Sequence, residues 1–149
     1  MLSLREVTVR YGETVAVDAV SLDVSDGEVL ALLGPSGCGK STLLRAIAGI
    51  EPISSGRISF GGVDLARVPV HRRGFGLMFQ DGVLFPHRTV AGNVGYGLRG
   101  RPDAEVRVTE LLELVGLPGY GPRRVTTLSG GEAQRVALAR ALAPRPRLL

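Results

Sequence analysis

The sequence predicts an α/β fold built around a phosphate-binding loop, and three observations lead to this prediction. An apolar run at residues 29–33 leads into a glycine-rich turn and then into a helix-forming stretch, which gives the order strand, loop, helix. The turn matches the pattern G-x-x-x-x-G-K-[ST] from Gly34 to Ser41. Apolar residues make up 44% of the 149 residues, which is enough for one domain with a sizeable core.

The residue types of the loop indicate its chemistry. Glycines allow backbone N–H groups to converge on an anion, and the following helix adds its positive N-terminal end. Lys40, the single lysine among 18 basic residues, is a compact cation suited to terminal phosphates, and the Ser41 hydroxyl is placed to ligate Mg²⁺. The predicted phosphate-binding residues are Gly34, Pro35, Ser36, Gly37, Cys38, Gly39, Lys40, Ser41 and Thr42.

Alternating apolar residues predict strands before the loop. Valine and leucine alternate with polar residues at 7–9 and again at 20–24, which predicts two strands that each have one covered face. Residues 11–13 and 25–27 have the composition of turns. Residues 29–33 are apolar without alternation, which predicts a strand buried on both faces.

Helix and strand patterns continue after the loop. Apolar residues at helical spacing over 43–48 predict a helix that stops at Gly49. Alternation predicts short strands at residues 57–60 and 75–79, and the second of these leads to Gln80.

The character of the chain changes near residue 81, where we place a boundary. Residues 81–88 form a predicted loop with exposed apolar and aromatic side chains. Thr89 is a candidate N-cap for a weak, glycine-interrupted helix. A better helix is predicted over residues 103–115, because its apolar residues share one stripe and Gly116 follows them.

A second anion-binding pattern, Leu-Ser-Gly-Gly-Glu, occupies residues 128–132. Ser129 can cap the helix that follows, while Gly130 and Gly131 expose backbone N–H groups at its positive end. Most Ser-Gly-Gly turns bind no ligand, so this pattern alone is weak evidence. It gains weight because the same chain carries the phosphate loop.

Charge, cysteine content and hydropathy narrow the classes of function. The net charge of +4 is spread along the chain without an aromatic-interleaved basic patch, which argues against a nucleic-acid partner. The single cysteine, Cys38, cannot form an internal disulfide and is expected to fill space in the loop. No stretch approaches 18 consecutive apolar residues and no signal-peptide pattern follows Met1, so we expect any membrane role to come through a partner.

With these motifs, almost the whole chain resembles the nucleotide-binding subunit of an ATP-binding-cassette (ABC) transporter. The resemblance makes residues 34–42 the Walker A loop, Gln80 the Q-loop glutamine, and residues 128–132, ending in Glu132, the signature motif. Tyr11 sits where this family places an aromatic side chain that stacks on adenine, and an ordinary turn tyrosine is the alternative. ATP and Mg²⁺ are the implied ligands, with Ser41 and Gln80 on the metal and Ser129, Gly130, Gly131 and Glu132 on the nucleotide.

The resemblance also implies partners. The stretch from Leu84 to Val90 is similar to bacterial importer subunits for polyamines, ferric iron, thiamine, or sulfate and molybdate, where it belongs to the surface that grips the membrane permease. The chain departs from these relatives at Gly92, before Asn93, where an acidic residue is common. A second ATP-binding subunit is implied, paired across the nucleotide, and the implied location is the cytoplasmic face of the cell membrane through the permease.

The implied fold is a P-loop NTPase core with an N-terminal antiparallel β-subdomain and an inserted helical subdomain. Residues 1–81 would be the nucleotide core with its β-subdomain, 82–143 the helical subdomain with the signature, and 144–149 the start of the Walker B strand. In the family, a Walker B aspartate, a catalytic glutamate and a switch histidine follow. We therefore expect a truncated fold whose C-terminal part is missing, with no residue of this chain able to act as general base.

The implied function is an ATP-binding and, when complete, ATP-hydrolysing subunit that powers solute import by a bacterial ABC transporter. This chain alone is expected to hydrolyse ATP poorly. Two alternatives stay open, namely a nucleotide-binding fragment without catalysis and a soluble ABC ATPase of DNA repair or translation. The importer-like stretch from Leu84 to Val90 argues against the soluble ATPase.

Overall fold

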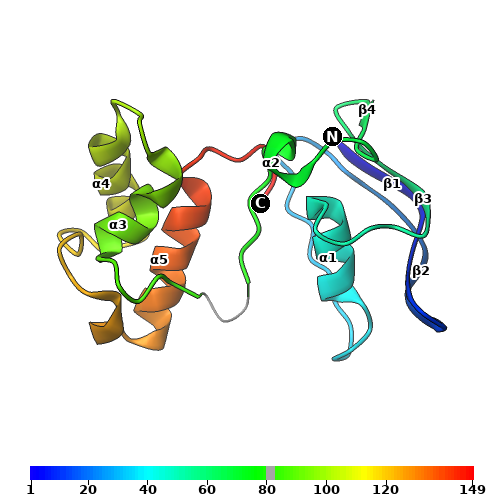
Figure 1. Ribbon diagram of the computed structural model, residues 1–149, viewed down its shortest axis with the longest axis horizontal. Helices are drawn as coiled ribbons and strands as arrows, with labels where there is room; N and C mark the ends of the chain where they lie inside the picture. The colour runs from blue at the N-terminus through cyan, green and yellow to red at the C-terminus, as the bar shows by residue number, and fades with distance from the viewer. Residues whose placement is uncertain (80–82) are drawn as a thin grey trace. The chain divides into compact units, whose positions relative to one another are not determined.

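The computed structural model describes residues 1–79 and 83–149, which form two compact units, Met1–Gly74 and Phe75–Leu149 (Figure 1). Gln80 lies outside the described residues, and so does the boundary that the sequence predicts near residue 81. Both stay predictions. Within the described residues, no helix has the length and apolar character needed to cross a membrane.

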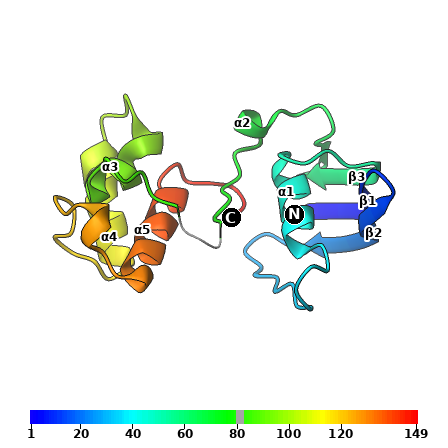
Figure 2. The ribbon, with the colours of Figure 1, turned by 60° about the horizontal axis from the view of Figure 1, so that its bottom comes forward.

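The first unit is built on an antiparallel sheet with the strand order β2-β1-β3-β4. Its strands are β1 (Leu2–Tyr11), β2 (Thr14–Val24), β3 (Ser55–Phe60) and β4 (Val63–Asp64). Figure 2 shows β1 between β2 and β3, and Leu2 is accordingly paired with Val24 on one side and with Phe60 on the other. The strands predicted at residues 7–9, 20–24 and 57–60 are confirmed.

Helix α1 (Lys40–Ala48) packs its apolar face on β1 and β2. Leu43, Ala46 and Ile47 are buried in this contact. Gly49 follows in the left-handed conformation, with φ of 82°, and its N–H donates to the Ala46 carbonyl over 3.0 Å. The predicted helix stop at Gly49 is confirmed, because glycine accepts this conformation without strain.

Residues 29–33 do not form the predicted strand, and this prediction is wrong. Val29 is 94% exposed and Leu33 is 91% exposed. A strand requires a neighbour that takes up its backbone N–H and C=O groups, and none of the described strands pairs with this segment. The apolar composition was visible in the sequence, but the pairing partner of such a run is not a local property.

The second unit is helical, and α3 and α4 pack on α5 (Figure 1). Its elements are α3 (Val90–Val94), the 3₁₀ helix η1 (Gly95–Leu98), α4 (Ala104–Leu114), the 3₁₀ helix η2 (Val125–Thr127) and α5 (Gly130–Leu142). Its core consists of Val90, Val94, Leu98, Val108, Leu111, Leu112, Leu117, Val136, Ala139 and Ala143. The helix predicted over residues 103–115 is confirmed, and the Thr89 hydroxyl caps α3 by accepting from the Gly92 N–H at 3.1 Å.

The strand predicted at residues 75–79 is reduced to one parallel bridge between Phe75 and Leu148. The Gly76 N–H donates to the Leu148 carbonyl over 2.8 Å. Beyond that point Met78 and Phe79 are exposed, because no described strand continues alongside them. The prediction is therefore wrong after Phe75.

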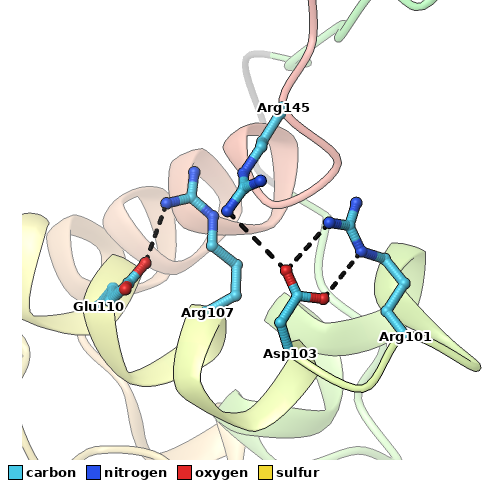
Figure 3. Close-up of polar contacts among 5 residues, drawn as sticks. All are labelled: Arg101, Asp103, Arg107, Glu110 and Arg145. Carbon is cyan, nitrogen blue, oxygen red and sulfur yellow. Dashed lines mark hydrogen bonds and ion pairs between the residues drawn. The ribbon is translucent and has the colours of Figure 1, made fainter.

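Ion pairs hold the start of α4. Asp103, the N-cap residue, lies between Arg101, at 3.0 Å, and Arg145, at 3.8 Å (Figure 3). The hydrogen bond from Arg101 holds the pKa of Asp103 below its ordinary value. Arg107 pairs with Glu110 one turn along the helix, at 3.3 Å. The Arg145–Asp103 pair links the residues after α5 to the start of α4, whereas the other pairs are local. All of them contribute little to stability because water screens exposed charges.

Candidate functional site

The loop from Gly34 to Gly39 joins residues 29–33 to the N-terminus of α1. Gly37 and Gly39 have φ values of 83° and 86°, a conformation that L side chains rarely adopt. Gly39 also lies directly against β2, where an added Cβ would come within 2.0 Å of the Ala16 carbonyl oxygen. Glycine at position 39 therefore allows the loop to turn while its backbone contacts the sheet.

The Lys40 ammonium lies across the loop. Its Nζ donates to the carbonyls of Gly34, at 2.8 Å, and Pro35, at 2.6 Å, and lies 3.4 Å from the Cys38 sulfur. All three contacts are exposed to solvent. The ammonium can therefore exchange them for phosphate oxygens without leaving a buried polar group unpaired.

The first turn of α1 presents its free amides beside Lys40. The Leu43 N–H already donates to the Gly39 carbonyl at 2.9 Å, so the amides before it are the unpaired ones at the helix start. This turn holds no acidic residue, and Ser41 is exposed. The positive end of the helix, the ammonium and a hydroxyl thus meet at one place, which is suited to an anion that carries a metal ion.

A cavity of about 480 Å³ opens beside the loop. Its lining includes Val17, Val20 and Leu22 of β2 together with Cys38 and Lys40. Tyr11 stands outside this lining, at the end of β1, and its side chain is 46% exposed. The structure thus leaves the Tyr11 ring accessible on the same unit as the loop.

The signature segment forms a complete capping box at the start of α5. The Ser129 hydroxyl accepts from the Glu132 N–H at 3.3 Å, and the Glu132 carboxylate accepts from the Ser129 N–H at 2.8 Å. The Ser129 hydroxyl also donates to this carboxylate at 2.9 Å. Sequence reasoning identified Ser129 as a cap but missed the reciprocal role of Glu132, which the S-x-x-E spacing could have shown.

Glu132 is further held by Tyr120, whose hydroxyl donates to its carboxylate at 2.9 Å. The Arg123 guanidinium lies over the Tyr120 ring, 3.7 Å from its centre. The Ser129 N–H is the largest cause that lowers the pKa of Glu132. Because the folded state lowers this pKa, the ionised carboxylate stabilises the cap at pH values above the ordinary pKa of glutamate. This stabilisation is lost as the pH falls through the lowered pKa.

Gly130 and Gly131 leave the positive end of α5 open. An added Cβ at either position would meet no atom within 4 Å. The helix start is therefore accessible to a large anion, while the capping box holds its first turn in place.

Ser129→Ala is expected to lower the free energy of unfolding by about 1 kcal/mol, because the Glu132 N–H loses its acceptor. Ser129→Asn should restore most of this loss, since asparagine is an equally good cap. Urea denaturation of the full chain measures the difference. The matched control is Thr126→Ala, an exposed hydroxyl in η2, and an equal loss in this control would contradict the capping role.

The segment after the undescribed residues is less exposed than the sequence predicts. Leu84 packs against the helical core, and Phe85 is half-buried. The Phe85 ring contacts the Tyr96 ring, with centroids 4.6 Å apart, and the Arg140 guanidinium lies 5.2 Å from its centre. The prediction that Leu84 and Phe85 are exposed is wrong, because α5 and η1 supply side chains that cover them. Pro86 is exposed as predicted.

Asn93, which is fully buried, fixes this segment to α3. Its side-chain oxygen accepts from the Phe85 N–H at 2.8 Å, and its NH₂ donates to the carbonyls of Phe85, at 3.1 Å, and Thr89, at 3.0 Å. Arg140 completes the arrangement by donating to the same Asn93 oxygen at 3.5 Å and to the Val83 carbonyl at 2.7 Å. Asn93 stood out in the sequence only because relatives commonly have an acidic residue just before it.

Comparisons of the sequence with known proteins match ATP-binding proteins of transporters. A family model described as "ABC transporter" matches residues 17–149. The Fe(3+) ions import ATP-binding protein FbpC of Streptomyces avermitilis is 60% identical over 100% of this chain and 44% of its own length. The putrescine transport ATP-binding protein PotG of Escherichia coli K12 is 51% identical over 100% of this chain and 41% of its own length. The chain thus spans less than half the length of these curated relatives.

The fold has a solved counterpart. It is similar to the dimeric structure of a post-hydrolysis state of the ATP-binding cassette MJ0796 bound to ADP and Pi, with a TM-score of 0.84 and 32% identity. This match covers 98% of the present chain and 71% of the solved one. Sequence and fold therefore point to the same family.

Proposed function

Because the chain belongs to the ABC transporter family and has the α/β P-loop fold of an ABC ATPase, we propose that it is the ATP-binding part of an import ATPase subunit. The observation that carries this proposal is the Lys40 ammonium, held across a loop of left-handed glycines at the N-terminus of α1. FbpC is an import ATP-binding protein by name and PotG a transport ATP-binding protein by name, which supports a role in solute import.

We propose that Lys40 and the loop amides bind the β- and γ-phosphates of ATP. Mg²⁺ takes one or two protein oxygens and completes its shell with phosphate oxygens and water, and the exposed Ser41 hydroxyl is an oxygen donor of the right kind. Gln80 is the second proposed Mg²⁺ ligand, on the sequence alone. Bound Mg²⁺ would neutralise charge on the phosphates. Tyr11 is proposed to stack on adenine.

The proposed partners follow from the second unit. A second ATP-binding subunit would bring the α5 start, with Ser129, Gly130 and Gly131, over the γ-phosphate bound by its counterpart, and the solved relative is described as dimeric. Glu132 would support this contact by holding the cap. The membrane permease would contact the stretch from Leu84 to Val90 on the cytoplasmic face of the membrane, mainly through its exposed residues. ATP hydrolysis and solute import belong to that complete assembly.

Calorimetric titration of the 149-residue chain with ATP and Mg²⁺ tests the proposal. We expect ATP to bind saturably, and ADP and inorganic tripolyphosphate to displace it, because the loop recognises phosphates. Adenosine at the same concentration should compete far less. Binding of adenosine with the affinity of ATP, or no saturable binding of ATP, would contradict a phosphate-directed site.

A further inference from the structure

Arg73, at the end of α2 (Val70–Arg73), hydrogen-bonds the C-terminal end of α1. Its Nη1 donates to the carbonyls of Ile47, at 2.8 Å, and Ala46, at 3.4 Å. On the other side, its Nε donates to the Val68 carbonyl at 3.0 Å and its Nη2 to the Leu65 carbonyl at 3.0 Å. One half-buried guanidinium thus joins α1 to the segment that follows β4.

This contact meets two physical needs of α1. The last carbonyls of a helix have no partner within the helix, and they form the negative end of its dipole. A guanidinium supplies both hydrogen bonds and a positive charge, and its planar fork reaches two directions at once. A lysine at position 73 has a single nitrogen and cannot bridge both sides in the same way.

Both ends of α1 therefore pack closely against other parts of the unit. At its N-terminus Gly39 lies on the Ala16 carbonyl, as described above. At its C-terminus Gly49 lies on Arg73, and an added Cβ would come within 2.5 Å of the guanidinium carbon. A helix of 9 residues is a short rigid rod of roughly 14 Å, so a shift at one end tilts the other. The end opposite Arg73 carries Lys40 and the free amides.

We propose that Arg73 is a positioning residue for the phosphate loop, acting through α1 on the orientation of Lys40 and the first-turn amides. The inference rests on the proposed nucleotide binding and adds to it a residue that touches no part of the loop. Arg73 sets where the helix start points, whereas Lys40 makes the phosphate contact.

The test compares Arg73→Gln with Arg72→Gln, the neighbouring exposed arginine, so that both variants lose the same charge. The probe is inorganic tripolyphosphate, which reports on the loop without adenine contacts. Arg73→Gln is expected to weaken its binding about tenfold, and Arg72→Gln to leave it unchanged. Circular dichroism and a melting curve confirm that each variant is folded at the temperature of the titration.

The conservative variant Arg73→Lys separates positioning from folding. It should remain folded and bind tripolyphosphate with an affinity between those of the wild type and Arg73→Gln, and it decides the question if Arg73→Gln is unfolded. A folded Arg73→Gln, or failing that Arg73→Lys, that binds tripolyphosphate as tightly as the wild type would overturn the proposal. A wild-type chain that binds neither tripolyphosphate nor ATP would instead remove the proposed function, and this inference with it.

Discussion

Lys40→Ala is expected to weaken the binding of ATP to this chain by a factor of about a hundred, because hydrogen bonds to a charged group contribute up to about 3 kcal/mol. The ammonium lies across the loop, and its hydrogen bonds to Gly34, Pro35 and Cys38 are all exposed. No other lysine in the chain could replace it. The measurement is a calorimetric titration with ATP and Mg²⁺.

The same substitution should leave the stability of the fold unchanged. Since the contacts of Lys40 are exposed, the free energy of unfolding is expected to change by less than about 0.5 kcal/mol. Arg67→Ala, which removes an exposed charge from the same unit, controls for the change in net charge and should leave ATP affinity unchanged. Unaltered ATP affinity in Lys40→Ala would show that the loop does not hold the phosphates.

Asn93→Ala is expected to lower the free energy of unfolding by about 3 kcal/mol. The substitution leaves the Phe85 N–H without its acceptor in a part-buried site. The carbonyls of Phe85 and Thr89 each lose the side-chain donor but keep a backbone donor, the Arg88 N–H and the Asn93 N–H respectively. It also opens a small cavity next to the core of the second unit. Urea denaturation of the full chain, followed by tyrosine fluorescence, measures the loss; Tyr96 and Tyr120 report on the second unit, and Tyr11 on the first.

Gln134→Ala is the matched control for this prediction. Gln134 is an exposed amide in α5, so its removal is expected to cost less than about 0.5 kcal/mol. Equal stabilities for Asn93→Ala and the control would mean that water satisfies the freed groups. That result would contradict the anchoring role of Asn93.

Features that depend on local chemistry could be predicted from the sequence. Gly49 ends α1, Thr89 caps α3 and Ser129 caps α5, and each of these is decided by a few neighbouring residues. The backbone of the loop is of the same kind, since Gly37 and Gly39 take the left-handed conformation that their positions call for. That the loop binds phosphate stays a prediction. The roles of Gln80 and Tyr11 stay predictions.

Features that depend on distant residues could not be predicted in this way. Residues 29–33 look like a buried strand, but pairing needs a neighbour that the local pattern does not specify. The burial of Phe85 comes from Tyr96 and Arg140, which later parts of the chain supply. The contacts of Arg73 with α1 likewise join residues far apart in the sequence, and no short motif announces them.

The exposure of residues 29–33 has a practical consequence for anyone who prepares this chain. The stretch between Glu28 and Lys40 contains no charged side chain, Val29, Leu30 and Leu33 are exposed, and none of the described strands pairs with residues 29–33. Such a stretch lacks the gatekeeper charges that keep strands from adding to one another. We expect concentrated samples to aggregate through it, so biochemical work should begin with dilute samples or with the chain fused to a solubilising protein.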